Sequence, residues 1–251
     1  MESNDIIYGL RAVIEAIEAG KSIDKIFIRK DLKSDLANEL WDQIKRHRLF
    51  AQKVPVEKLN RFTHGNHQGV VALLASVNYT RVGVLVPQLY EEGVLPFVVV
   101  LDGITDVRNF GAIARTAECC GVDALVIPER GSASAGGDAM KASAGALNHI
   151  EVCRERNLEA AVKYLKDNGY QIVAVSEKAN GNYTTPDYTT PVALVMGAED
   201  VGISPEIMRL ADTRVSIPMF GKIGSLNVSV AAGLMMYEVV RQRLNDNLEV
   251  I

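Results

Sequence analysis

Short apolar runs alternate with segments of helical periodicity from Phe97 to the end of the chain. The apolar runs predict strands near residues 97–101, 124–127, 150–153, 171–176, 192–196 and 214–217. The segments between them predict helices near residues 109–120, 138–147, 157–167, 204–211 and 225–244. This alternation predicts an α/β domain with a mostly parallel sheet and helices on both of its faces. Residues 178–191, polar and rich in Thr and Tyr, interrupt the pattern and predict a mobile loop.

The first 78 residues carry a shorter pattern of the same kind. Apolar residues between Leu10 and Ile17 follow helical spacing, and Ser34 is placed to cap a second helix. Strands are expected at Ile26–Ile28, near residues 49–54 and within 70–77. We therefore expect a small domain over residues 1–78 and a larger one over 97–251. Residues 79–96 contain two glycines and two prolines and predict the linker between them.

Composition excludes several classes of protein. The 251 residues contain no run of eighteen apolar positions, and residues 1–5 are polar and acidic, unlike a signal peptide. We expect a soluble cytoplasmic protein without a membrane partner. Cys119, Cys120 and Cys153 are too few and too unevenly spaced for a disulfide framework or a zinc site, so we expect core thiols. The four histidines show no metal-binding spacing either, so no metal is expected.

Charge is distributed unevenly along the chain. The formal net charge is −4, yet residues 25–61 hold 10 Lys and Arg against 5 Asp and Glu. The basic residues there are Lys25, Arg29, Lys30, Lys33, Lys45, Arg46, Arg48, Lys53, Lys58 and Arg61. A cluster of this kind is more often a solvated face than a binding surface, so by itself it supports nucleic-acid binding only weakly.

Three of the expected strands end in a glycine-bearing turn that carries polar side chains. Leu101 leads into Gly103 and then Asn109, and Met196 leads into Gly197 and Glu199. The strand ending near Ile217 leads into Gly221, Gly224, Ser225 and Asn227. Open α/β sheets bind ligands at such carboxyl ends. Any one of these turns is as well explained by a simple strand-to-helix connection, but three together favour a ligand site.

Familiar glycine and serine motifs are missing. No G-x-G-x-x-G follows the first strand of either part, which argues against a nicotinamide oxidoreductase. Gly221-Lys222 is followed by Ile223 rather than by Ser or Thr, so the sequence has no Walker A motif. No G-x-S-x-G elbow is present, which argues against an α/β-hydrolase.

Three ordered segments resemble the motifs of the SpoU (TrmH) family of RNA ribose 2'-O-methyltransferases, which use S-adenosylmethionine. They are Asn109–Thr116, Met196–Gly202, and Ser216–Pro218 together with Ser225–Ala231. The first 78 residues, from Tyr8-Gly9 to Gly69-Val70, are similar to the small L30e-like substrate-binding domain of one branch. That branch methylates a guanosine of 23S rRNA.

The resemblance implies a SPOUT-type α/β methyltransferase domain whose C-terminal segment forms a trefoil knot, an exception to the usual rules of chain topology. It also implies a homodimer whose active site is completed across the interface. Gly197, Ile217 and Leu226 match positions that hold the cofactor. The polar active-site set of the family is matched by Asn109, Arg115, Glu199, Ser225 and Asn227.

The chemistry calls for a cation near the target hydroxyl. A ribose 2'-hydroxyl is a weak nucleophile that must lose its proton as it attacks the methyl group. The guanidinium of Arg115 is suited to fork onto a phosphate and to stabilise the developing negative charge. Arginine is normally too basic to act as a base itself, so an RNA phosphate is the alternative proton acceptor. Glu199 is expected to fix Arg115 or Asn109, while Ser225 and Asn227 position the cofactor and the backbone.

The sequence therefore predicts an S-adenosylmethionine-dependent RNA 2'-O-methyltransferase that acts on a guanosine of 23S rRNA. A tRNA guanosine 2'-O-methyltransferase is the alternative within the same class. From another class, the alternative is a non-catalytic, ribosome-associated RNA-binding protein. The presence of all five polar active-site residues argues against that last alternative.

Overall fold

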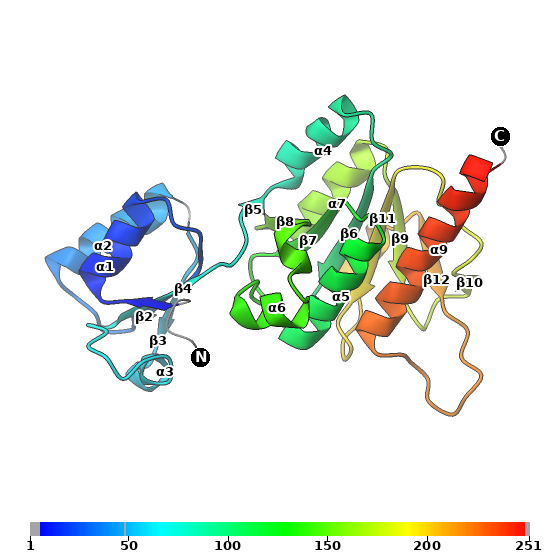
Figure 1. The fold of residues 1–251 in the computed structure, drawn as a ribbon. Coiled ribbons are helices and arrows are strands. Elements are labelled where there is room, and N and C mark those ends of the chain that lie inside the picture. The colour runs from blue at the N-terminus through cyan, green and yellow to red at the C-terminus, as the bar shows by residue number, and fades with distance from the viewer. Residues whose placement is uncertain (1–5, 48, 249–251) are drawn as a thin grey trace. The chain divides into compact units, whose positions relative to one another are not determined.

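The chain forms two compact units. The computed structural model describes residues 6–47 and 49–248, without the side chains of 245–248, so residues 1–5 and Arg48 lie outside the described residues. Unit 1 comprises Met1–Asn78 with Ser134–Gly137, and unit 2 comprises Tyr79–Ala133 with Asp138–Ile251 (Figure 1).

Unit 1 is built on a four-stranded sheet with the order β1-β4-β2-β3. The strands are β1 (Ile6–Tyr8), β2 (Ile23–Arg29), β3 (Ala51–Val54) and β4 (Val70–Leu74), and the helices are α1 (Leu10–Glu18), α2 (Asp35–Arg46) and α3 (Val56–Asn60). Only the edge pair β2 and β3 is parallel. Along β2, Ile26 and Ile28 pack with α1 and α2, while Phe27 packs on the other face with Leu59 of α3. This alternation follows the two-residue period of a strand.

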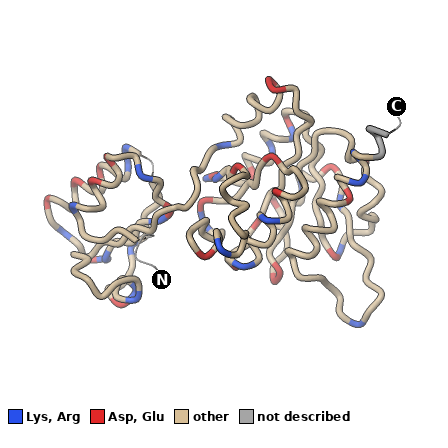
Figure 2. Tube along the Cα trace, in the orientation of Figure 1, with Lys and Arg blue, Asp and Glu red and all other residues tan. Residues whose placement is uncertain are grey.

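The expected capping of the second helix is confirmed. The Ser34 Oγ accepts a hydrogen bond of 3.1 Å from the Ala37 N–H, and α2 begins one residue after Ser34. Basic and acidic residues are mixed along the helices of unit 1 (Figure 2). The basic excess of residues 25–61 is therefore not a single uniform face.

A short segment from the later part of the chain completes unit 1. The Ser134 hydroxyl donates to the buried Asp24 carboxylate at 2.5 Å, and the Ser76 N–H donates to the Ala135 carbonyl at 3.0 Å. No sequence pattern indicated that residues 134–137 would join the first domain.

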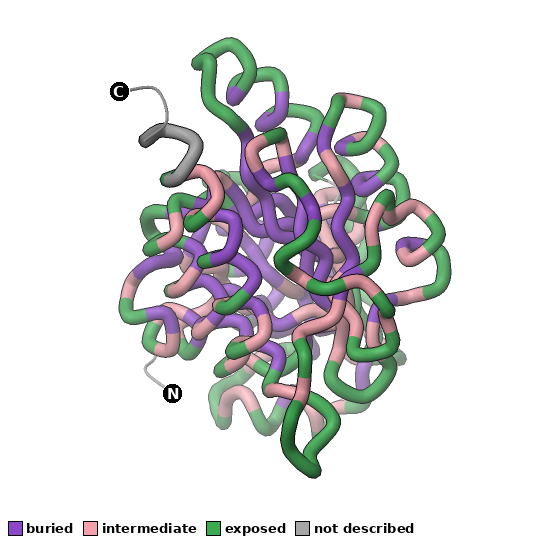
Figure 3. Tube along the Cα trace, turned by 90° about the vertical axis from the view of Figure 1, so that its right-hand side faces the viewer, coloured by how far each residue is buried: buried purple, intermediate pink, exposed green. Residues whose placement is uncertain are grey.

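Unit 2 contains an eight-stranded sheet with the order β10-β12-β9-β11-β6-β7-β8-β5. Every strand pairing in this sheet is parallel. The strands are β5 (Tyr79–Thr80), β6 (Phe97–Asp102), β7 (Ala124–Pro128), β8 (Glu151–Glu155), β9 (Gln171–Val175), β10 (Gly181–Asn182), β11 (Val192–Gly197) and β12 (Thr213–Ser216). The central strands are buried along their length (Figure 3). The predicted parallel sheet is thus confirmed.

Helices cover both faces of this sheet. They are α4 (Val82–Glu91), α5 (Val107–Cys119), α6 (Gly137–Ala142), α7 (Leu158–Asp167), α8 (Pro205–Leu210) and α9 (Val228–Leu248), with a 3₁₀ turn at Ala146–Asn148. One core joins α4, α7 and α8 to Val98 and Val100 of β6. On the opposite side α5 packs against α9, which also contacts β11. Among the described residues, no helix has the length and apolar character needed to span a membrane.

The prediction that residues 79–96 form a linker is wrong. Residues 79–96 form β5, which pairs with β8, and α4, whose Val82, Leu85, Val86 and Leu89 are buried in the core of unit 2. These four residues follow helical spacing, and the glycines and prolines around them concealed that pattern. Pro87 lies inside α4.

The expected mobile loop over residues 178–191 is also wrong, because this segment packs against α9. Its Tyr188 is completely buried, and the Tyr188 hydroxyl donates to the Tyr183 carbonyl at 2.8 Å. The Gln242 side-chain amide of α9 donates to the Pro186 carbonyl and accepts from the Tyr188 N–H. The strand β10 adds two residues to the sheet from within this segment.

Three further expectations need correction. The last helix starts at Val228 rather than near residue 225, so the polar residues before it lie in a loop. The helix expected over 138–147 ends at Ala142 and is followed by the 3₁₀ turn. Of the three cysteines, only Cys153 is a buried core thiol, whereas Cys119 is exposed and Cys120 is half-buried. The two vicinal cysteines lie at the C-terminal end of α5.

Candidate active site

The candidate site lies at the carboxyl edge of the unit 2 sheet. The strands β6 and β11 pair in parallel from Phe97↔Val192 to Asp102↔Gly197, so the loops that follow them emerge side by side. The loop from β12 to α9 reaches the same edge, since its residues line a cavity together with Gly197. The three glycine-bearing turns identified in the sequence therefore converge.

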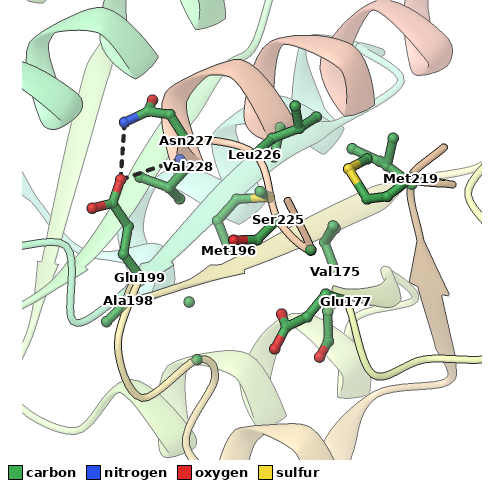
Figure 4. A pocket seen from close by; sticks show the side chains of 16 residues that line it. Val175, Glu177, Met196, Ala198, Glu199, Met219, Ser225, Leu226, Asn227 and Val228 are labelled. Atoms are coloured by element: carbon green, nitrogen blue, oxygen red, sulfur yellow. Dashed lines mark hydrogen bonds between the residues drawn. The ribbon is translucent and has the colours of Figure 1, made fainter. Parts of the chain in front are cut away.

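A carboxylate and two amides form the centre of the site. The Glu199 Oε1 accepts hydrogen bonds from Asn109 Nδ2 at 3.1 Å and from Asn227 Nδ2 at 2.9 Å. The same oxygen is 3.4 Å from the Val228 N–H, and Asn227 Nδ2 also donates to Asn109 Oδ1 at 3.0 Å. Figure 4 shows Glu199 pointing toward Asn227 and the start of α9. We call these three residues the amide–carboxylate cluster.

Helix caps place the two amides. The Asp106 Oδ1 accepts from the N–H groups of Arg108 (2.8 Å) and Asn109 (2.9 Å), which fixes Asn109 in the first turn of α5. At the other helix, Asn227 Oδ1 accepts from the Ser229 N–H at 2.9 Å. Side-chain oxygens at such positions satisfy N–H groups that the helix leaves unpaired. Each cap therefore stabilises a helix and orients a polar group of the site.

A tight turn presents Glu199. Ala198 and Gly202 exchange two backbone hydrogen bonds of 2.9 and 3.2 Å, and Gly202 has a positive φ of 71°. A Cβ atom on Gly197 would lie 2.3 Å from the Gly202 carbonyl carbon, so no side chain fits there. The Asp102 carboxylate accepts from the Ser204 N–H at 2.7 Å and fastens the end of this turn to β6.

A cavity of about 340 Å³ opens beside the cluster. Its walls combine apolar and polar surface, and the apolar part includes Val175, Met196, Ile217, Met219, Leu226 and Ala231, with Gly197 beside them. All three residues expected to bind a cofactor, Gly197, Ile217 and Leu226, line it. Ser225 lies on its rim, exposed and with no side-chain hydrogen bond to the described residues. The cavity volume falls in the range of ordinary small-molecule sites.

Sequence reasoning missed two polar residues of this cavity. Ser176 and Glu177 follow β9 directly and line the cavity wall. In Figure 4, Glu177 lies on the side of the cavity opposite Glu199. Unlike Glu199, the Glu177 carboxylate has no hydrogen bond or ion pair with any described residue. The strand-end rule that located the other turns applies to β9 as well, but no motif drew attention to it.

A second hollow, of about 230 Å³, lies on the other side of Glu199. It is lined by Gly103, Thr105, Asp106, Asn109 and Asp200, among others. Both hollows share Ala198, Glu199 and Val228 as lining residues. The amide–carboxylate cluster therefore has one concave surface on each side.

Arg115 does not join this cluster. It lies six residues beyond Asn109 on α5, which places it roughly 9 Å further along the helix axis and on a different face. Its side chain is exposed and makes no hydrogen bond or ion pair with the residues that the structure describes. Glu199 was expected to fix Arg115 or Asn109, and in the structure it accepts a hydrogen bond from Asn109.

No metal centre is seen in the described part of the chain, where no group of three His, Cys, Asp or Glu side chains is placed to hold an ion. Two of the three cysteine thiols, those of Cys120 and Cys153, are poor nucleophiles. Burial raises the pKa of the Cys153 thiol to about 12. Burial, reinforced by the neighbouring Cys119, raises the pKa of the Cys120 thiol to about 11, although a hydrogen bond with Tyr237 opposes the shift.

Two protein-family models match the chain. The model described as the SpoU rRNA Methylase family matches residues 96–237, and the one described as RNA 2'-O ribose methyltransferase substrate binding matches residues 6–80. A relative from Staphylococcus saprophyticus is 40% identical over 238 residues, covering 95% of this chain and 96% of its own length. A relative from Staphylococcus aureus is 39% identical with the same coverage. Both carry the provisional name TrmH family tRNA/rRNA methyltransferase.

Solved structures show the same fold. The SpoU methyltransferase AviRb from Streptomyces viridochromogenes, in complex with AdoMet, aligns with a TM-score of 0.60 at 24% identity, over 96% of this chain and 90% of its own. An AdoMet-bound rRNA methyltransferase from Sinorhizobium meliloti aligns with a TM-score of 0.59 at 25% identity, over 94% and 87%. The A. aeolicus TrmH/SpoU tRNA modifying enzyme gives a TM-score of 0.56 at 31% identity, over 65% and 86%.

The family models together span most of the chain, and the converged glycine turns coincide with the larger match. The smaller match falls on unit 1 and on β5. By sequence and by fold, this chain belongs to the SpoU family of RNA methyltransferases.

Proposed function

We propose that this protein transfers a methyl group from S-adenosylmethionine to the ribose 2'-hydroxyl of a guanosine in 23S rRNA. The observation that carries the proposal is the amide–carboxylate cluster, which stands between a cavity with both apolar and polar walls and a second, more polar hollow. This arrangement suits a reaction that brings a small cofactor and a nucleotide together.

The larger cavity fits the cofactor by its chemistry. Ile217, Leu226 and Met196 offer apolar walls for a purine ring, and Ser225 and Glu177 offer polar groups for a ribose or an amino-acid tail. When bound there, S-adenosylmethionine supplies a methyl group activated by its sulfonium. Two structural neighbours, AviRb and the Sinorhizobium meliloti enzyme, are crystallised with this cofactor, which supports the same assignment here.

The contacts of Glu199 assign it a positioning role. Its Oε1 already accepts hydrogen bonds from Asn109 and Asn227. These contacts fix the two amides at the border of the two hollows. We assign the proton to an RNA phosphate oriented by Arg115, because a guanidinium keeps its own proton.

The position of Arg115 supports a homodimer. Within one copy this side chain is too far along α5 to meet the cluster, and it is exposed. The helix that packs on α5 exposes Val230, Leu234 and Tyr237 by 52%, 42% and 54%. We propose that a second copy covers this apolar face and that its Arg115 completes the site, as the family resemblance implies. We further propose a trefoil knot at the C-terminal cofactor loops, as the family resemblance implies, and a cytoplasmic location, as the composition of the chain led us to expect.

Two alternatives to this proposal are a tRNA substrate and a non-catalytic role. The A. aeolicus neighbour is named a tRNA modifying enzyme, but it covers only 65% of this chain. The match of residues 6–80 to a substrate-binding domain favours the rRNA branch, which the sequence of unit 1 resembles. The non-catalytic alternative requires a silent site, whereas the amide–carboxylate cluster is fully assembled.

One experiment distinguishes an rRNA from a tRNA substrate and a catalytic from a non-catalytic role. The purified protein is incubated with methyl-labelled S-adenosylmethionine and either 23S rRNA or total tRNA from a strain that lacks the protein, and ribose methylation is mapped on the product. We expect label at one guanosine of 23S rRNA, whereas rRNA from the parent strain, already methylated there, should accept none. Label in tRNA alone would overturn the rRNA assignment. Cofactor binding without methyl transfer to any RNA would favour the non-catalytic alternative.

A further inference from the structure

The single tryptophan of the chain lines a hollow on unit 1. This hollow, of about 480 Å³, is bounded by Asn38, Trp41, Asp42 and Lys45 of α2 and by Lys53 of β3. One side of the Trp41 side chain packs against the core under α1 and α2, yet the residue is only half-buried. Part of the indole therefore remains accessible from the hollow.

Strand register brings Lys53 to the ring. Lys53 pairs with Ile28, whose side chain packs in the core beneath α1 and α2. Because side chains alternate along a strand, Lys53 is on the same face of the sheet as Ile28 and α2. Since β3 is the edge strand, Lys53 extends beyond the core, and its Nζ lies 5.5 Å from the centre of the Trp41 ring.

The cations of the hollow are available to a ligand. Lys45 and Lys53 are exposed, and neither makes an ion pair or a side-chain hydrogen bond with a described residue. The only acidic side chain among the lining residues is Asp42. Two free ammonium groups beside an accessible indole form a positively charged hollow with an aromatic wall.

The other face of the same sheet provides a contrast. There the Nζ of Lys58 lies 4.8 Å from the centre of the Phe27 ring, a similar cation–π contact. Phe27, however, is buried and stacked on Phe62, with ring centroids 4.9 Å apart. A base has no access to that ring. The open indole thus distinguishes the Trp41 hollow from an ordinary pairing of a lysine with an aromatic ring.

We propose that the Trp41 hollow binds single-stranded RNA, with one base stacked on the indole and an adjacent phosphate held by Lys45 and Lys53. The proposal rests on the proposed function, since it identifies where unit 1 grips the RNA substrate. Stacking on aromatic side chains and backbone neutralisation by lysine are the usual elements of single-strand recognition. The flexible stem of Lys53 lets its ammonium move from the ring to a phosphate as the base enters.

An acidic protein segment would use the hollow differently. Its carboxylates would pair with Lys45 and Lys53 but would make no use of the ring face. A nucleotide engages both the ring and the cations, so RNA explains the whole arrangement. Double-stranded RNA keeps its bases stacked inside the helix and does not offer one to Trp41.

The tryptophan serves as its own reporter. The full-length protein is titrated with a single-stranded 12-nucleotide RNA and with the corresponding duplex, while tryptophan emission is recorded. The anisotropy of a dye on the same RNA measures binding independently. We expect the single strand to quench the emission in parallel with the anisotropy change, and the duplex to leave it unquenched. Saturated binding of the single strand with unchanged emission would overturn the proposal, and would leave a protein segment as the occupant.

Matched variants test the cations. Lys45→Glu and Lys53→Glu should each weaken single-strand binding roughly tenfold and flatten the salt dependence by about 0.7 in log–log slope for each phosphate that is no longer neutralised. Lys58→Glu makes the same charge change beside the buried ring and should have little effect. Equal losses of affinity for Lys53→Glu and Lys58→Glu would refute a specific hollow and point to general electrostatic attraction.

Variants at the ring complete the test. Trp41→Phe should keep most of the affinity, whereas Trp41→Leu should lose roughly tenfold or more by anisotropy, as expected when a stacked base loses its aromatic partner. Circular dichroism of both variants is the control that checks that they are folded. None of these measurements needs S-adenosylmethionine, so absent methyl transfer would refute the proposed function alone, and absent quenching would refute this proposal alone.

Discussion

Replacing Asn227 with aspartate should disrupt the amide–carboxylate cluster through charge repulsion. Asn227 donates to Glu199 at 2.9 Å and to Asn109 at 3.0 Å, and an aspartate has no proton to donate. Two unit charges about 4 Å apart repel by about 1 kcal/mol in water and about 4 kcal/mol at an effective dielectric constant of 20. Both side chains are exposed, so we expect a repulsion of about 1–2 kcal/mol.

Two other effects modify this value. Losing two hydrogen bonds costs about 1 kcal/mol each. The new charge at the start of α9 is favoured by the helix dipole, by about 0.3–1 kcal/mol, and aspartate caps a helix about as well as asparagine. The net loss in the free energy of unfolding is therefore about 2–4 kcal/mol, which corresponds to a Tm lower by about 4–16 °C for a domain of this size.

The double variant Glu199→Gln/Asn227→Asp provides the decisive comparison. It removes the repulsion and lets the glutamine amide donate to the new carboxylate, so its Tm in calorimetry should exceed that of Asn227→Asp alone. The control is Asp200→Asn/Asn227→Asp, because the Asp200 carboxylate accepts a hydrogen bond from the Val201 N–H and from no other residue that the structure describes. Simple addition of the two single effects, or equal rescue by Asp200→Asn, would refute the reasoning.

Three other predictions concern the active site and the core. Arg115→Ala should lower turnover roughly 10²-fold or more while leaving cofactor affinity nearly intact, and Arg115→Lys should rescue it poorly because an ammonium lacks the planar fork; near-normal turnover of the lysine variant would contradict this role. Gly197→Ala places a Cβ 2.3 Å from the Gly202 carbonyl carbon. It should therefore weaken S-adenosylmethionine binding in calorimetry roughly tenfold or more, a change of about 1.4 kcal/mol. Gly221→Ala is the control, because its Cβ meets open space and should leave the affinity unchanged. Because burial raises the pKa of the Cys153 thiol to about 12, brief alkylation at pH 8 followed by peptide mapping should modify the exposed Cys119 first and Cys153 only after unfolding; equal labelling rates would argue against the buried position.

Most of the fold could be predicted because the central strands are continuous apolar runs. Val98–Leu101 and Val192–Met196 are buried on both faces, so every position in them is apolar. The helix at 82–91 escaped prediction because Pro87 and the flanking glycines conceal a regular apolar spacing. The segment 178–191 was misinterpreted for another reason. Its order comes from hydrogen bonds with α9, a contact between residues far apart in the sequence.

The site was predicted to the extent that its geometry follows from strand ends. Parallel pairing of β6 with β11 is sufficient to bring the loops of Asn109 and Glu199 together. The same rule extended to β9 would have found Glu177. The place of Arg115 follows from no pattern within one chain, because six helical residues separate it from Asn109.

The burial of α4 has a consequence for where the catalytic part of the chain can be cut. Val82, Leu85, Val86 and Leu89 are each at most 7% exposed. Burying side chains of this size stabilises a protein by about 1.5–3 kcal/mol each, at most about 6–12 kcal/mol for the four, which is comparable with the whole stability of a typical domain. A fragment that starts at residue 96, where the match to the methylase family model begins, should fail to fold, while one that starts at residue 79 should give a cooperative thermal transition. The smallest autonomous folding unit therefore begins well before the first residue of its catalytic motifs.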